Sequence, residues 1–487
     1  MKNYKSRFHA VTFNKPIIKI FFRKSIAFIF FFCLLRFNSH SQILPEAALE
    51  KSVDSLIATQ LKPNEPGISV LIAEKNNILY KKAFGSANVE LNVAMQPGMI
   101  FRIGSITKQF TAIGILQLVE QGKISLQDSI QKYIKDFPSK GYTITIENLL
   151  THTSGIPDYS NGDTTHNPYI ERHDFTPPQI IKYFDYLPLE FKPGTKYNYS
   201  NSGYVLLAYI IEKVTGEDYH QYMMKNVISL AGLQHTLFAD EHTIIPNRVE
   251  GYTRDRGFFE NCEYQTASMA FGCGDLMSTT EDLYKWNNAL LDYKLVSKET
   301  LSKAFTSYKL SDGSYTNYGY GWFVDSFGVK RIHHEGQVSG FTAFEEYYPD
   351  KDVYVSILTN QLSGEDTTDF SDKRFRLFNN IFQLALGNKL ETEAIISEAI
   401  LDEYIGTYQA VIKKSETLKI YKEQGKLYMD LSNKTGRHMV LQPLSQNLFL
   451  LPDVMRIRST AEFIRENGKV AKAIFTQEKP YEWIKIK

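Results

Sequence analysis

The stretch FRIGSITKQFTAIGILQLVEQGK, residues 101–123, combines the start of a helix with two reactive side chains. FRIG is typical of a short strand and a turn glycine, and the apolar spacing that follows predicts a helix opening at Ser105. Positions i and i+3 share one helix face, so Lys108 should lie within reach of the Ser105 hydroxyl. A helix N-terminus also favours an anionic intermediate. The stretch predicts Ser105 as a nucleophile and Lys108 as its base.

This spacing is weak evidence by itself, because Ser129 and Lys132 repeat it. Ser129 lies in a polar stretch with no preceding strand and glycine, so we interpret the second match as chance. A helix-capping serine beside a solvated lysine is the alternative for Ser105 and Lys108. Further motifs are needed to decide between them.

Tyr199-Ser200-Asn201 lies within FKPGTKYNYSNSGYVLLAYIIEKVTG, residues 191–216. A Pro-Gly turn and the helical spacing after Gly203 place Tyr199 on a loop just ahead of a helix. A phenol there can shuttle a proton if a neighbouring lysine lowers its pKa, and Asn201 can orient the substrate and the lysine. A buried structural tyrosine is the alternative.

His334-Glu335-Gly336 precedes FTAFEEYYPDKDVYVSILTN, residues 341–360, which predicts an antiparallel hairpin. His334 should therefore lie on an adjoining strand. A glycine at 336 would let a substrate approach the backbone closely, and the N–H of Gln337 could complete an oxyanion hole with that of Ser105. A lone histidine on a strand is more often structural.

The first 41 residues contain eight Lys and Arg and no acidic residue. Their apolar core, SIAFIFFFCLL at residues 25–35, is short for a membrane span and predicts an export signal. An uncleaved membrane anchor is the alternative. Removing these eight from the 55 Lys and Arg leaves 47 against 54 Asp and Glu, a net charge near −7. That balance argues against a nucleic-acid partner.

Composition also limits the chemistry. The chain has 487 residues, 43% hydrophobic and 22% charged, which is typical of a globular protein of two or three domains. We find no metal-ligand spacing and no glycine-rich phosphate loop, so we expect no metal and no cofactor. Cys262 and Cys273 remain after signal cleavage and could form a disulfide or stay as two buried thiols.

Together these motifs resemble the serine β-lactamase and penicillin-binding-protein superfamily, closest to its class C branch with esterase and peptidase relatives. The resemblance covers roughly residues 46 to 385. It rests on FRIGSITKQF, LLTHTSGI (149–156), the tyrosine loop, GCGDLMSTTEDLYKW (272–286), GYGW (319–322) and HHEGQVSGF (333–341).

The resemblance implies Ser105 as the acylated nucleophile, Lys108 and Tyr199 as the proton-transfer pair, and Asn201 as a substrate-orienting group. His334 matches the first position of a motif that is typically lysine, threonine and glycine in β-lactamases and carboxypeptidases, where it holds the substrate carboxylate. Glutamate follows it here and would repel a carboxylate. We therefore expect esters or other amides as substrates.

The predicted fold is α+β. It comprises an antiparallel sheet flanked by helices and a helical subdomain, with a helix over residues 47–61 and a hairpin over residues 68–85. From residue 404 onward, about eight short strands predict a small β-barrel that resembles the lipocalin-like domain of related hydrolases. We predict a signal peptide at 1–41, a hydrolase domain at 42–390, a linker at 391–402 and a barrel domain at 403–487.

The predicted function is that of an exported, periplasmic or secreted serine hydrolase acting through an acyl-enzyme on a small ester, amide or peptide. A D-Ala-D-Ala carboxypeptidase, penicillin-binding protein or β-lactamase acting on peptidoglycan-derived substrates is the alternative among enzymes. The alternative from another class is a catalytically silent binding or scaffold protein. Membrane association is expected only if the signal stays uncleaved.

Overall fold

The structure is a computed structural model. It describes residues 44–161, 172–240, 242–255, 258–326, 329–363, 370–390, 393–431, 439–451, 459–476 and 480–487. The predicted signal peptide lies outside these residues. Among the helices of the described ranges, none combines the length and apolar character that crossing a membrane requires.

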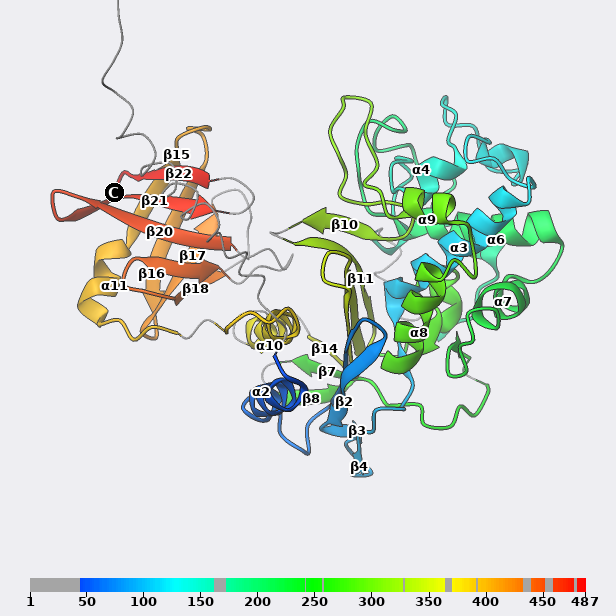
Figure 1. Ribbon diagram of the computed structural model, residues 1–487. Helices are drawn as coiled ribbons and strands as arrows, with labels where there is room; N and C mark the ends of the chain where they lie inside the picture. Colours follow the sequence, from blue (N-terminus) through cyan, green and yellow to red (C-terminus); the bar gives the residue numbers. More distant parts are fainter. Residues whose placement is uncertain are drawn as a thin grey trace, which may run out of the picture. The chain divides into compact units, whose positions relative to one another are not determined.

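A six-stranded antiparallel sheet organises the hydrolase region (Figure 1). Its central strands are buried on both faces, as the continuous apolar run ISVLIAE requires. The predicted hairpins at the start of this region and after residue 340 are confirmed. In spatial order, the strands are β10 (Phe323–Ser326), β11 (Lys330–Val338), β12 (Phe341–Tyr348), β13 (Val353–Thr359), β1 (Ile68–Glu74) and β2 (Asn77–Phe84).

Helices cover both faces of this sheet. Helices α2 (Glu46–Ala58) and α10 (Phe370–Ala385) pack on one face, where they share an apolar core with alternate residues of β1 and β13. Helices α3 (Thr107–Glu120) and α8 (Thr280–Leu291) belong to the larger core on the other face, together with α6 (Asn201–Thr215). The predicted first helix is confirmed, although it ends three residues earlier than expected.

Shorter elements connect these layers. The short helices are α4 (Ile146–Leu150), α5 (Pro177–Ile181), α7 (Tyr219–Met223) and α9 (Lys298–Ala304). The small sheets pair β3 (Ser86–Asn88) with β4 (Val93–Ala94), β9 (Leu276–Ser278) with β5 (Phe101–Arg102) and β6 (Leu237–Phe238), and β7 (Tyr252–Asp255) with β8 (Phe258–Asn261) and β14 (Gln361–Ser363).

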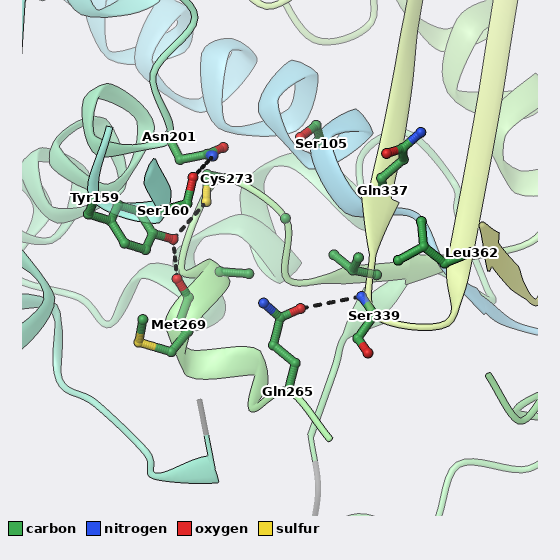
Figure 2. Close-up of a pocket in the computed structure, with 13 residues that line it drawn as sticks. Ser105, Tyr159, Ser160, Asn201, Gln265, Met269, Cys273, Gln337, Ser339 and Leu362 are labelled. Carbon is green, nitrogen blue, oxygen red and sulfur yellow. Dashed lines mark hydrogen bonds between the residues drawn. The ribbon is translucent and has the colours of Figure 1, made fainter. Parts of the chain in front are cut away.

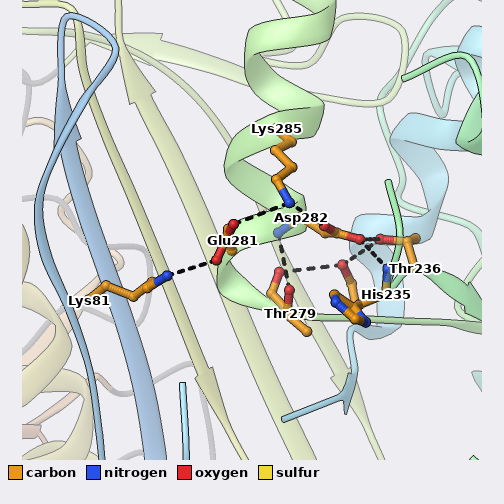
Figure 3. Close-up of polar contacts among 8 residues, drawn as sticks. Lys81, His235, Thr236, Thr279, Glu281, Asp282 and Lys285 are labelled. Atoms are coloured by element: carbon orange, nitrogen blue, oxygen red, sulfur yellow. Dashed lines mark hydrogen bonds and ion pairs between the residues drawn. The ribbon is translucent and has the colours of Figure 1, made fainter. Parts of the chain in front are cut away.

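The N-terminus of α8 is fixed by polar side chains (Figure 3). Thr279 caps the helix by accepting a hydrogen bond from the N–H of Asp282 at 3.1 Å. The buried Asp282 carboxylate accepts from the N–H of His235 at 2.6 Å. Glu281 pairs with Lys81 of β2 at 2.8 Å, so α8 is tied to the sheet that it covers.

The C-terminal region is a closed antiparallel barrel, which confirms the eight predicted strands. The turns at Gly425 and Gly468 each place two consecutive residues at positive φ, as two-residue hairpins prefer. Helix α11 (Glu398–Tyr404) precedes the barrel. The strands are β15 (Gly406–Ala410), β16 (Thr417–Glu423), β17 (Lys426–Leu431), β18 (Met439–Pro443), β19 (Leu448–Leu451), β20 (Ser459–Glu466), β21 (Lys469–Thr476) and β22 (Pro480–Lys485).

Candidate active site

Ser105 lies in a 3₁₀ turn, Gly104–Ile106, which leads directly into α3. The helix predicted to open at Ser105 therefore begins as a tighter turn, but Ser105 and Lys108 still face each other. Lys108 Nζ lies 3.0 Å from Ser105 Oγ. By contrast, Lys132 of the second Ser-x-x-Lys match pairs with Asp128 at the surface, and Ser129 caps a short turn. The first pair is therefore in contact at a buried lysine, whereas the lysine of the second pair is exposed.

Lys108 is fully buried and has three polar neighbours. Besides Ser105, its Nζ donates to Asn201 Oδ1 and to the carbonyl oxygen of Cys273, both at 2.8 Å. An amide oxygen and a carbonyl oxygen can only accept, so they fix two of the N–H bonds of the amine. The remaining tetrahedral direction points to Ser105 Oγ. A neutral Lys108 would therefore direct its lone pair at the serine hydroxyl.

The environment of Lys108 favours this neutral form. Burial, the largest effect, lowers the pKa of Lys108 to about 8, although the negative charges of Asp158 and Asp275 oppose the shift. About a tenth of the side chain is then a neutral amine at pH 7, far more than for a lysine of ordinary pKa. The expectation that Lys108 loses its proton readily is met in direction, and desolvation is the main cause.

Tyr199 lies on the loop immediately before α6, as predicted. Its ring lies 4.9 Å from Lys108 Nζ. Its hydroxyl is buried and has no hydrogen-bond partner among the described residues. Burial raises the pKa of Tyr199 well above its ordinary value, although the nearby Ser105 hydroxyl acts in the opposite direction. The condition that a neighbouring lysine lowers this pKa is therefore not met, because desolvation outweighs the effect of Ser105.

Asn201 is the first residue of α6 and contacts both sides of the site. Its Oδ1 accepts from Lys108, whereas its Nδ2 donates to Asp158 Oδ2 at 3.1 Å and to Ser160 Oγ at 3.3 Å. Both amide hydrogens are thus used within the protein. In this state Asn201 orients the lysine and has no N–H left for a substrate.

His334 lies on β11, as predicted, and its ring is buried. Its Nδ1 donates to the carbonyl oxygen of Glu335 at 2.5 Å, and its Nε2 accepts from the hydroxyl of Tyr318 at 3.0 Å. Burial, the charge of Lys108 and the neighbouring His333 lower the pKa of His334 well below its ordinary value. His334 is therefore a neutral, fully hydrogen-bonded imidazole.

His152 supports the tyrosine loop. It takes a positive φ of 56°, and its Nδ1 accepts from the N–H of Ser200 at 3.1 Å. Its ring packs against that of Tyr199, with centroids 4.2 Å apart. Burial and Lys108 lower its pKa well below the ordinary value, so it is also neutral. These contacts give His152 a structural role, because they hold the loop that carries Tyr199.

Gly336 brings β11 against the turn that carries Ser105. A Cβ at this position would lie 1.9 Å from the carbonyl oxygen of Ile103 and 2.9 Å from the nitrogen of Ser105. Only glycine permits this approach without a shift of one backbone segment. Gln337 follows on the same strand and lines the cavity beside Ser105.

The cavity in front of Ser105 has a volume of about 280 Å³ (Figure 2). Tyr159, Ser160 and Met269 lie on one side of it, and Gln337 and Leu362 lie on the other. Among the residues that the structure describes, none that lines the cavity is charged. The lining consists of Ser105, Tyr159, Ser160, Asn201, Gln265, Met269, Ala270, Cys273, Gly274, Gln337, Val338, Ser339 and Leu362.

The sequence analysis missed several groups that complete this site. Asp158 and Tyr318 hold Asn201 and His334, and the Cys273 carbonyl holds Lys108. A carbonyl oxygen carries no side-chain signal, and Asp158 acquires its contact only when distant segments meet. Cys273 is a buried free thiol and Cys262 is also free, which answers the disulfide question that the sequence left open.

Comparisons with known proteins agree with this geometry. Residues 53–376 match the family described as Beta-lactamase. Penicillin-binding protein 4* of Bacillus subtilis (strain 168) is 27% identical over 431 residues, covering 82% of this chain and 91% of that protein.

Solved structures give a similar result. The octameric penicillin-binding protein homologue from Pyrococcus abyssi is 28% identical with a TM-score of 0.63, covering 90% of this chain and 100% of that one. A D-stereospecific amidohydrolase from Streptomyces sp. is 25% identical with a TM-score of 0.56, covering 65% of this chain and 94% of that one. This chain therefore belongs to the serine β-lactamase and penicillin-binding-protein superfamily of serine hydrolases.

Proposed function

We propose that this protein is an exported hydrolase that cleaves an ester or amide through an acyl-enzyme on Ser105. One observation carries the proposal. Two carbonyl oxygens hold the N–H bonds of Lys108, and its remaining direction faces Ser105 Oγ at 3.0 Å. A buried amine with a pKa of about 8 is suited to accept the serine proton near neutral pH.

The mechanism follows from these positions. Neutral Lys108 accepts the proton as Ser105 Oγ attacks the carbonyl carbon. The N–H groups of Ser105 and Gln337 stabilise the oxyanion of the tetrahedral intermediate. Tyr199, which remains a neutral phenol because of its burial, donates a proton to the leaving group and regains it from Lys108. Water then attacks the acyl-enzyme through the reverse sequence and releases the acid.

The substrate is proposed to lack a carboxylate next to the scissile bond. Both nitrogens of His334 are engaged and its ring is neutral, so it offers no positive charge at the position that holds a carboxylate in β-lactamases. The cavity lining is uncharged among the described residues. A neutral ester or amide therefore fits this cavity better than an anionic stem peptide.

A D-Ala-D-Ala peptidase acting on peptidoglycan-derived peptides is the second candidate. The similarity to penicillin-binding protein 4* and to the penicillin-binding protein homologue favours it. In both proposals residues 1–41 are a signal peptide, residues 42–390 form the hydrolase domain, 391–402 a linker and 403–487 a lipocalin-like barrel domain.

Intact mass spectrometry of the mature protein tests these proposals. The protein is mixed with a penicillin and, separately, with a p-nitrophenyl ester, and adduct formation and product release are followed. Rapid ester turnover without a stable penicillin adduct supports the ester or amide hydrolase. A long-lived penicillin adduct on Ser105 supports the peptidase. Ser105→Ala should remove either adduct, and equal behaviour of this variant and the wild type would instead support a silent scaffold.

A further inference from the structure

A buried carboxylate that the mechanism above does not use lies behind Asn201. Asp158 is 8% exposed. Its Oδ1 accepts from the N–H of Ser160 at 3.0 Å and from its hydroxyl at 2.9 Å. Its Oδ2 accepts from Asn201 Nδ2 at 3.1 Å. Both carboxylate oxygens are therefore oriented by donors of fixed position.

These contacts determine which way the Asn201 amide faces. With the amide as it stands, its oxygen meets a donor on Lys108, and its nitrogen meets acceptors on Asp158 and Ser160. A flipped amide would place its oxygen against the carboxylate and its N–H₂ against the N–H of Lys108 that Oδ1 now accepts. To accept from that N–H₂, neutral Lys108 would have to turn its lone pair toward Asn201 and away from Ser105.

We propose that Asp158 is a positioning residue, which fixes the Asn201 amide so that Lys108 keeps its lone pair for Ser105. The inference rests on the proposed function, because it assigns Lys108 as the base. Asp158 is not itself among the residues that line the cavity, and it acts on Lys108 through Asn201.

The charge of Asp158 provides a readout that a purely structural residue would lack. Its negative charge opposes the effect of burial on the Lys108 pKa. Removing that charge should lower the pKa of Lys108 further. The rise of kcat/KM with pH, which follows deprotonation of Lys108, should then occur at lower pH.

The experiment measures pH profiles of p-nitrophenyl ester hydrolysis by the mature protein and its variants. In Asp158→Asn, the new N–H₂ opposes either the donors of Ser160 or the N–H₂ of Asn201, so the anchor of the Asn201 amide is weakened in one orientation and lost in the other. We expect kcat/KM to fall roughly 10- to 100-fold and the rise with pH to shift downward. In an Asn201→Ala background, the same substitution should change kcat/KM on the plateau of the pH profile less than twofold, because the two residues act as one unit there.

Asp282→Asn is the matched control, since Asp282 is also a buried carboxylate that accepts backbone and hydroxyl hydrogens. It should lower stability without moving the pH profile. Multiplicative effects of the Asp158 and Asn201 substitutions, or an unmoved profile in Asp158→Asn, would overturn the inference. If Asp158→Asn does not fold, Ser160→Ala takes its place. Its effect on kcat/KM is then measured with and without Asn201→Ala, as a double-mutant cycle. An unreactive wild type would contradict the proposed function instead.

Discussion

The interior of the hydrolase region contains a lysine amine, three imidazoles and several carboxylates, whereas the described interior of the barrel is mostly made of aliphatic and aromatic side chains. Lys108, His152, Asp158, His334 and Glu345 are all buried. Among the described barrel residues, Ser459 and Thr460 are the buried polar ones. Burying polar groups costs free energy unless each finds a partner, so the hydrolase region requires long-range hydrogen bonds that the barrel does not.

The difference indicates two ways in which sequence specifies structure. The barrel follows largely from local pattern, because alternating apolar residues define its strands and glycine turns define the hairpins β16–β17 and β20–β21. The site follows from contacts among segments far apart in sequence. Lys108 contacts residues 93 and 165 positions away. Substitutions in the two regions should therefore separate activity from stability.

Lys108→Met should give the largest effect. It removes the proposed base while preserving side-chain length, so kcat/KM should fall about 10⁴-fold. The free energy of unfolding should change by less than about 2 kcal/mol, because relief of the buried charge offsets the lost hydrogen bonds. Ester hydrolysis and denaturant unfolding measure the two quantities.

Lys132→Met is the matched control for this prediction. Lys132 belongs to the second Ser-x-x-Lys match but is exposed and paired with Asp128. Its removal should leave both activity and stability nearly unchanged. Activity retained in Lys108→Met would contradict the assignment of the base.

Phe463→Ala should have the opposite outcome to Lys108→Met, with a large loss of stability and little change in ester hydrolysis. Phe463 is 1% exposed, stacks on Tyr404 at 4.4 Å and meets Phe449 edge-on at 5.4 Å. The cavity left behind should cost about 3–5 kcal/mol of barrel stability. Thermal unfolding followed by tryptophan fluorescence near Trp483 should show the loss. Unaltered unfolding would indicate that the barrel interior can repack.

The contrast between local pattern and long-range contact also explains which features of the fold and of the site could be predicted from the sequence. The central hairpins and the eight barrel strands were predictable, since period-two apolar spacing and turn glycines are local signals. The contact between Ser105 and Lys108 was predictable, because residues i and i+3 share a helix face. The roles of Asp158 and the Cys273 carbonyl were not, because each depends on tertiary contact. The raised pKa of Tyr199 was missed for the same reason, since burial is a property of the whole fold.

Glu345→Gln tests the buried carboxyl group of Glu345, which lies on β12 and contacts Gln109 of α3. Glu345 accepts from Gln109 and, at 3.1 Å, from Tyr354, and burial raises its pKa to about 7. The folded protein therefore binds its proton more tightly than the unfolded chain does. Stability should fall as pH rises from about 4.5 through 7. Glutamine should remove this slope and gain on the order of 2 kcal/mol at pH 8.

Unfolding free energies measured from pH 3 to 8 check this prediction. Glu281→Gln is the control, because the pKa of the half-exposed Glu281 is lowered, first by Lys81, and its effect should have the opposite sign. Parallel pH profiles of Glu345→Gln and the wild type would mean that the Glu345 carboxyl does not titrate in this range.

Gly425→Ala should give the smallest effect and tests whether the barrel depends on local conformation. Gly425 takes φ of +76° in the turn between β16 and β17, and a Cβ there would meet no atom within 4 Å. The substitution should therefore lower the free energy of unfolding by about 1 kcal/mol through backbone strain, and it should leave activity unchanged. Gly336→Ala is the counterpart in the hydrolase region, because its Cβ would lie 1.9 Å from the Ile103 oxygen. It should impair ester hydrolysis by displacing β11 from Ser105, so equal effects of the two glycines on activity would contradict the distinction between local and long-range specification.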